Sequence, residues 1–184
     1  LKGAPTRWYP DKNLKGLVPR VRRFSILADV AVAPDMSYGL MAAYSFGKDG
    51  NFGAFLKGRS NFRKEDFSYE CSSDGTTSNG YIWTSGKTSI SRFQVSAGAT
   101  AKILKPLSVY AGAGYGSRTL QWEDSDGKWA KVTDRSYKGL AIDAGFLLRP
   151  FSGSSLEGLV FEAGAGIIPA GPYYDVTVGV GWSF

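Results

Sequence analysis

Three carboxylates in the last third of this 184-residue chain, Asp143, Glu162 and Asp175, are the side chains best suited to chemistry. A pair of them could do general acid–base work on a substrate. Alternatively, basic side chains could neutralise them as ion pairs. The sequence has no histidine, which removes Ser-His-Asp and Cys-His catalysis and most catalytic zinc sites. We therefore favour ion pairing and expect no enzymatic activity, no cofactor and no metal.

The remaining motifs carry little chemistry. The single cysteine, Cys71, excludes an internal disulfide, and we expect a free surface thiol there. The stretch AGAGYG at 111–116 looks like a phosphate-binding loop, but no Rossmann strand precedes it and no helix follows. The net charge is +6, yet no run of Lys and Arg exceeds two residues, so we expect no nucleic-acid partner.

Alternation with a period of two governs the chain from Phe24 onward. The final stretch YYDVTVGVGWSF shows it clearly, since bulky apolar residues alternate with polar or small ones. Successive side chains of a strand point to opposite sides, so each such stretch predicts a strand with one apolar face. Short turns such as GKDGN join the strands as hairpins. The eight predicted strands lie at about 24–33, 37–46, 52–62, 89–103, 108–122, 136–149, 157–168 and 173–184.

Eight strands of about ten residues match the smallest common closed membrane barrel. The two long connections, 63–87 and 123–135, fall on one side, as the outer loops of outer-membrane barrels do. The sequence therefore predicts an all-β protein with an eight-stranded antiparallel up-and-down transmembrane β-barrel over 23–184. An extended periplasmic lead-in over 1–22 would precede it. Both termini would be periplasmic, in the bacterial outer membrane.

The polar face of the strands consists mostly of Gly, Ala, Ser and Thr with isolated charges. A narrow lumen needs small residues beside the few that fill it. The other face has no charge over the central part of most strands, as contact with lipid requires. The isolated charges are four acidic and four basic, and unpaired charges inside a barrel would be costly. We predict a neutralised lumen ion network of Asp29, Lys57, Arg59, Arg92, Arg118, Asp143, Glu162 and Asp175.

Aromatic residues near the strand ends on the apolar face predict girdles at the headgroup level. These are Tyr38, Tyr44, Phe46, Tyr115, Tyr174, Trp182 and Phe184.

The terminal GVGWSF, after this series of strands, resembles small outer-membrane barrels of the OmpX/OmpA type. The resemblance covers 24–184. It implies a C-terminal signal for the barrel-assembly machinery, with Trp182 and Phe184 at the matching positions and Tyr174 upstream. It also implies contact with outer-membrane lipid, lipopolysaccharide and other outer-membrane proteins. The segments GLMAAYSF, LSVYAGAGYGSRTLQWE and YKGLAIDAGFLLRP look like barrel regions of Bacteroidota surface proteins. Enzymatic barrels of this size rely on a histidine, which is missing here.

Three functions remain open. The first is a structural or accessory subunit, or an interaction platform, in an outer-membrane assembly. The second is a small pore or transport channel. The third is a surface adhesin acting through residues 63–87 and 117–136.

Overall fold

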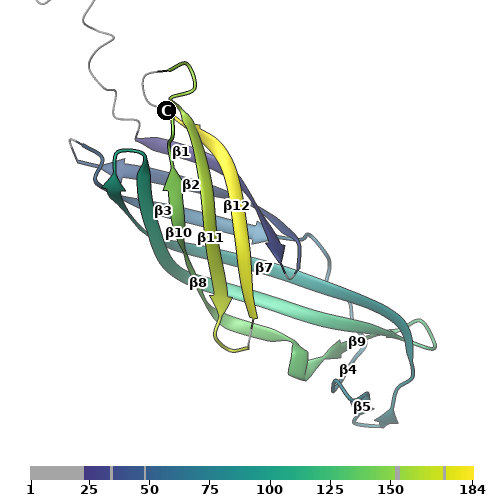
Figure 1. Ribbon diagram of the computed structural model, residues 1–184. Coiled ribbons are helices and arrows are strands. Elements are labelled where there is room, and N and C mark those ends of the chain that lie inside the picture. The colour runs from purple at the N-terminus through teal and green to yellow at the C-terminus, as the bar shows by residue number, and fades with distance from the viewer. Residues whose placement is uncertain (1–22, 34, 48, 152–153, 172) are drawn as a thin grey trace, which may run out of the picture.

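The computed structural model describes residues 23–33, 35–47, 49–151, 154–171 and 173–184. The predicted lead-in over 1–22 lies outside the described residues. Eight strands form a closed ring in which every neighbouring pair is antiparallel, and the pairings of β1 with β12 and of β8 with β10 complete it (Figure 1). The predicted eight-stranded barrel is confirmed. Its strands are β1 (Phe24–Ala33), β2 (Ser37–Phe46), β3 (Phe52–Ser60), β7 (Thr84–Leu104), β8 (Leu107–Asp124), β10 (Tyr137–Leu148), β11 (Leu159–Ile168) and β12 (Tyr173–Ser183).

Strands β7 and β8 run well past the ends of the other barrel strands (Figure 1). Strand β9 (Trp129–Val132) pairs with β8 beyond the ring, and β4 (Tyr69–Cys71) pairs in parallel with β9. A small hairpin of β5 (Thr76–Thr77) and β6 (Gly80–Tyr81) and a 3-10 turn, η2 (Thr133–Arg135), complete this end. We call residues 62–90 and 119–136 the extension.

The predicted loops 63–87 and 123–135 thus contain strands. Strand β7 begins five residues earlier than expected, with an irregular register between Thr84 and Thr88. The part of β8 that extends beyond the ring offers backbone hydrogen-bond partners to β9. No local alternation in these polar segments predicts that pairing. Pairing between distant segments therefore decided their structure.

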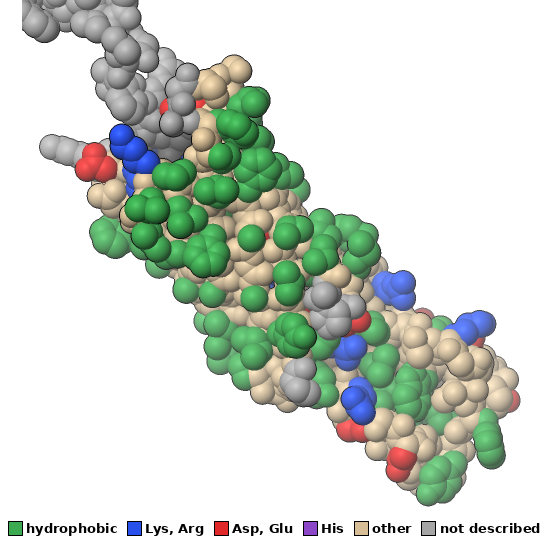
Figure 2. All heavy atoms as spheres, viewed as in Figure 1, with side chains coloured by type: hydrophobic (Ala, Val, Ile, Leu, Met, Phe, Trp, Pro, Cys, Tyr) green, Lys and Arg blue, Asp and Glu red, His purple; other side chains and the backbone are tan. Residues whose placement is uncertain are grey.

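The two faces of the barrel differ as expected for a wall between lipid and a filled interior. Leu40, Leu56 and Leu140 point outward and are more than half exposed, whereas Leu27 and Asp143 are fully buried inside. Figure 2 shows hydrophobic side chains covering the barrel, with charged ones gathered toward its ends and on the extension. No helix among the described residues is both long and apolar enough to cross a membrane.

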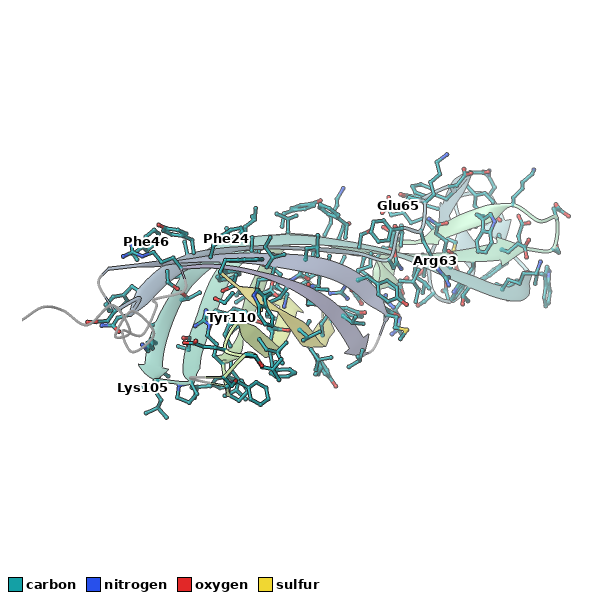
Figure 3. The ribbon with its side chains drawn as sticks, turned by 90° about the horizontal axis from the view of Figure 1, so that it is seen from above. Phe24, Phe46, Arg63, Glu65, Lys105 and Tyr110 are labelled. Carbon is teal, nitrogen blue, oxygen red and sulfur yellow. The ribbon has the colours of Figure 1, made fainter. Side chains whose placement is uncertain are left out.

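The lumen holds an apolar layer near the end of the barrel where β1 begins and β12 ends. Leu27, Met41, Phe55, Tyr110, Leu147 and Val160 form this layer together with Ala43. Tyr110 points into the barrel interior in Figure 3. Glycines make the space, because a Cβ on Gly112 would lie 2.7 Å from the Phe55 ring, and one on Gly164 would collide with Tyr110 Oη. The sequence pattern predicted small residues and ions in the lumen, and it did not predict this apolar layer.

Candidate functional site

A first group of lumen charges surrounds Lys57, which lies on β3 two residues beyond Phe55. Its Nζ donates to Glu162 Oε1 at 3.1 Å and to Thr177 Oγ1 at 3.1 Å, and it lies 3.4 Å from Asp29 Oδ2. The period of two places all four residues inward from β1, β3, β11 and β12. One ammonium thus joins two carboxylates across the lumen.

A second group lies one step further toward the extension. Arg59 Nη2 donates to Asp143 Oδ1 at 2.9 Å, and Gln94 Nε2 donates to Asp143 Oδ2 at 2.6 Å. Asp175 pairs with Arg92 and lies 3.5 Å from Arg59 Nη2. Every carboxylate in this group contacts a guanidinium group.

Burial defines what these seven charges can do chemically. None of Asp29, Lys57, Arg59, Arg92, Asp143, Glu162 and Asp175 is more than 3% exposed. Acid–base catalysis needs a carboxylate within hydrogen-bond reach of a bound substrate. Paired and buried in this way, the four carboxylates among them cross-link the walls of the barrel.

Arg118 lies apart from the other seven predicted network residues. It sits at the end of the lumen next to the extension, where Nε donates to Asp35 Oδ2 at 2.8 Å and Nη1 donates to the Arg135 carbonyl at 2.9 Å. Asp35 was not among the predicted residues, because it lies in the turn between β1 and β2, where strand alternation gives no direction. The guanidinium groups of Arg118 and Arg92 lie over the Tyr173 ring, at 4.7 and 4.4 Å from its centroid.

A cavity of about 420 Å³ opens above this point, and we call it the vestibule. Its residues come from the extension, from β8 and from the first residues of β10 and β12. They are Ser73, Arg118, Leu120, Trp122, Arg135, Tyr137 and Tyr173. The sequence analysis missed the vestibule, because its residues are brought together by the pairing of distant strands.

The extension has a small apolar core of its own. Cys71, Ala130 and Val132 are buried there, and Tyr69, Ile82, Leu120 and Trp122 pack against them. The thiol of Cys71 is free, as predicted, but its predicted surface position is wrong: the side chain is only 3% exposed, and burial raises the pKa of the thiol. The reason is the parallel pairing of β4 with β9, which turns Cys71 inward.

Hydrogen bonds to carboxylates fasten the extension together. Tyr69 Oη donates to Asp124 Oδ2 at 2.6 Å, and the amides of Asp126 and Lys128 donate to Asp124 Oδ1. Burial and this bond raise the pKa of Tyr69 to about 12, and the bond from Tyr69 holds the pKa of Asp124 below its ordinary value. Asp134 accepts from the Ser73 amide at 2.8 Å and joins η2 to the β4–β5 turn.

Large aromatic side chains project from the extension into solvent. Phe62, Tyr81 and Trp83 are 83%, 76% and 82% exposed. Arg63 and Glu65, next to Phe62 in the sequence, lie where the barrel passes into the extension, away from Lys105 (Figure 3). Exposed aromatic side chains of this size are typical anchors of protein interfaces.

The predicted assembly-signal residues line the closing seam of the barrel. Tyr174 and Phe184 point outward and are 65% exposed, whereas Trp182 packs so closely over Gly158 that a Cβ there would collide with its indole. The Phe184 amide donates to the Phe24 carbonyl at 2.7 Å. Recognition of these residues by an assembly machinery stays a prediction.

Comparison with known proteins rests on structure alone, since no protein-family model and no curated protein sequence matches the chain. The crystal structure of Ail, the attachment invasion locus protein of Yersinia pestis, is similar with a TM-score of 0.53 and 17% identity, over 88% of this chain and 97% of that one. The structure of Ail in a phospholipid bilayer nanodisc gives 0.52 and 19% over 88% and 99%.

The N-terminal β-barrel domain of Pseudomonas aeruginosa OprF is similar as well, with a TM-score of 0.52 and 15% identity over 89% of this chain and 98% of that one. The chain therefore has the fold of the small eight-stranded outer-membrane β-barrels of the OmpX/OmpA type. The Bacteroidota likeness stays a prediction.

Proposed function

We propose that the chain is a non-enzymatic outer-membrane barrel that serves as an interaction platform in an outer-membrane assembly. The barrel anchors the chain, and the extension carries the binding surface. One observation carries this proposal: β7 and β8 continue beyond the ring and support a folded layer with its own core and three exposed aromatic side chains. Their exposure in the isolated chain calls for a partner.

The filled lumen speaks against the channel hypothesis. The apolar layer around Phe55 and the ion groups around Lys57 and Arg59 occupy successive levels of the same interior. A permeant ion would have to displace paired, buried charges, which are costly to separate. We therefore rank the channel hypothesis after the interaction-platform hypothesis.

The adhesin hypothesis uses the same extension with a partner on another cell. Ail, whose structure is similar, is an attachment invasion locus protein, and this supports adhesion as the second candidate. The two candidates differ in whether the partner lies in the same membrane or on a foreign surface.

The proposed orientation places the extension outside the cell and both termini in the periplasm. The described turns on the terminus side are short, such as that between β7 and β8, and the long segments lie at the other end, as in outer-membrane barrels. The outward apolar face would contact outer-membrane lipid, with lipopolysaccharide around the outer rim.

A native pulldown from mild detergent tests the platform. The wild-type barrel should capture defined outer-membrane proteins, and the double variant Tyr81→Ala, Trp83→Ala should lose them, because interface aromatics commonly contribute 2 kcal/mol or more, roughly thirtyfold in affinity. Phe52→Ala is the matched control, since it removes an aromatic side chain that is 70% exposed at the opposite end.

Equal capture of partner proteins by the double variant and the wild type would contradict the proposal that the extension carries the binding surface. If the wild type captures no membrane protein but binds foreign cells through Tyr81 and Trp83, adhesion replaces the platform. Stable conductance of the purified barrel in planar bilayers would restore the pore.

A further inference from the structure

The vestibule is a cup built over the filled lumen. Its floor is Tyr173, whose ring lies against the guanidinium groups of Arg118 and of the buried Arg92. Because Arg92 also pairs with the buried Asp175, Tyr173 connects the vestibule to the ion network of the lumen. Its volume of about 420 Å³ falls within the usual range of small-molecule sites.

The chemistry of the lining is selective. Trp122 and Tyr137 supply aromatic side chains to the lining, whereas the Tyr173 ring is already covered by guanidinium groups. Two arginines, Arg118 and Arg135, belong to the lining, and no carboxylate does. Aromatic faces pack against the apolar faces of sugar rings, and guanidinium groups bind carboxylates and phosphates in a forked geometry. This combination fits a sugar ring that carries an anionic group.

The lining is fixed before any ligand arrives. Arg118 is held by Asp35, by the Arg135 carbonyl and by the Tyr173 ring. Tyr137 Oη donates to the Asp134 carbonyl at 3.2 Å, and its ring lies so close to Gly171 that a Cβ there would overlap it. Preorganised groups lose little freedom on binding, so more of the contact energy remains as affinity.

Two carboxylates lie nearby and limit the charge of the ligand. Asp35 accepts from Arg118 and Tyr173, and Asp134 accepts from Ser73. Asp35 therefore offsets part of the charge of Arg118, and Asp134 offsets part of the charge of the exposed Arg135. A ligand with a single anionic group matches this balance better than a polyanion does.

We infer that the vestibule binds a mono- or disaccharide unit bearing one carboxylate or phosphate group. The inference rests on the proposed function, because it makes the mouth of the barrel beneath the extension part of the binding surface. Such a unit could belong to the sugars of the cell's own envelope or to a glycan on another surface, and the two sources share the recognised chemistry.

Calorimetric titration of the barrel in phospholipid nanodiscs tests the inference. The probes are glucose 6-phosphate, a disaccharide containing glucuronic acid, and maltose as the neutral control. The anionic probes should bind and maltose should bind at least about tenfold more weakly, the worth of one charge-assisted hydrogen bond. Core oligosaccharide released from lipopolysaccharide and a set of host-type acidic disaccharides then separate the two sources.

Two variants probe the lining. Arg135→Ala should weaken the anionic probes about tenfold, and Tyr137→Leu should weaken all sugars by removing a ring face. Arg63→Ala removes one positive charge from the extension outside the lining and should leave affinity within about twofold. Heat-modified migration in gels verifies that each variant forms the barrel.

Equal affinity for maltose and the anionic probes, or an unchanged affinity in Arg135→Ala, overturns the inference. So does an equal loss in Arg63→Ala, which would indicate general charge attraction. If no sugar binds while Tyr81 and Trp83 still govern partner capture, the sugar site is wrong and the platform stands. If sugars bind but no partner is captured, the platform is wrong and the vestibule stands alone as a binding site.

Discussion

Buried charges form the residue-scale framework of this barrel. Arg59 contacts both Asp143 and Asp175 inside the lumen, and Arg92 pairs with Asp175, all four nearly inaccessible to solvent. A buried pair adds little net stability over an apolar pair, but removing one partner leaves an uncompensated charge. The network therefore acts as a constraint that holds opposite walls in one register.

Asp143→Asn tests this constraint. We expect it to lower the free energy of unfolding by about 3–5 kcal/mol, because Arg59 and Gln94 lose the charge that they bind. Glu70→Gln, which breaks the half-exposed pair with Lys131, should cost no more than about 1 kcal/mol. Urea titration of both variants in lipid vesicles measures the two values, and similar small losses would show that the lumen charges are solvated.

At the scale of elements, the extension is a layer with its own core and its own fastening bonds. Strands β7 and β8 run from the ring into the extension without a break. The segment after β3 joins it as well, and Asn61 and Arg63 bond there to β7. Its apolar core is small, so the hydrogen bonds of Asp124 to Tyr69 and to the turn amides contribute a large share of its stability. The extension should therefore open before the barrel does.

Asp124→Asn tests this fastening through its pH dependence. The folded pKa of Asp124 lies below its ordinary value, so its ionised form stabilises the extension above about pH 4 and this contribution fades as the pH falls. At pH 7 the variant should show faster hydrogen exchange in β4 and β9 than the wild type, and the difference should vanish toward pH 2. Exchange is corrected for the intrinsic rate at each pH.

Asp126→Asn is the matched control, because the Asp126 amide bonds to Asp124 whereas no hydrogen bond of its own carboxylate is among those of the described residues. It should exchange like the wild type at every pH. A constant difference between Asp124→Asn and the wild type over the whole pH range would contradict the assignment. The hydrogen bond from Tyr69 to Asp124 should persist to high pH. The protonated Tyr69 hydroxyl is the donor, and its pKa is raised to about 12.

At the scale of the whole molecule, the orientation in the membrane decides what the extension can meet. The short β7–β8 turn with Lys105 and the extension lie at opposite ends of the barrel (Figure 3). With Cys71 replaced by Ala, Ser78→Cys should react with a membrane-impermeant maleimide on intact cells, and Lys105→Cys only after the outer membrane is permeabilised. The reverse labelling pattern would show that the barrel has the opposite orientation, with the extension in the periplasm, and would contradict an extracellular interaction platform.

The sequence by itself determined the barrel, because each strand carries its alternation locally. The bounds of β1 and β2 agree with the prediction, and the inward parity of Lys57, Asp143 and Glu162 follows from it. The same alternation also places Phe55 and Leu147 on the lumen face. That they pack into one apolar layer cannot be predicted until the glycines that face them are known.

Only the tertiary structure decided the extension, the vestibule and the place of Arg118. The polar segments 63–87 and 123–135 have no strong period. Strand β9 folds back on the end of β8 across the turn at 125–128, and β4 pairs in parallel with β9, with Tyr69 opposite Ala130. Asp35 lies in the turn between β1 and β2. Its ion pair with Arg118 holds that guanidinium group in the lining of the vestibule, apart from the lumen ion network. Alternation specifies the two faces of a strand, whereas contacts between distant segments arise only when the ring closes and brings their ends together.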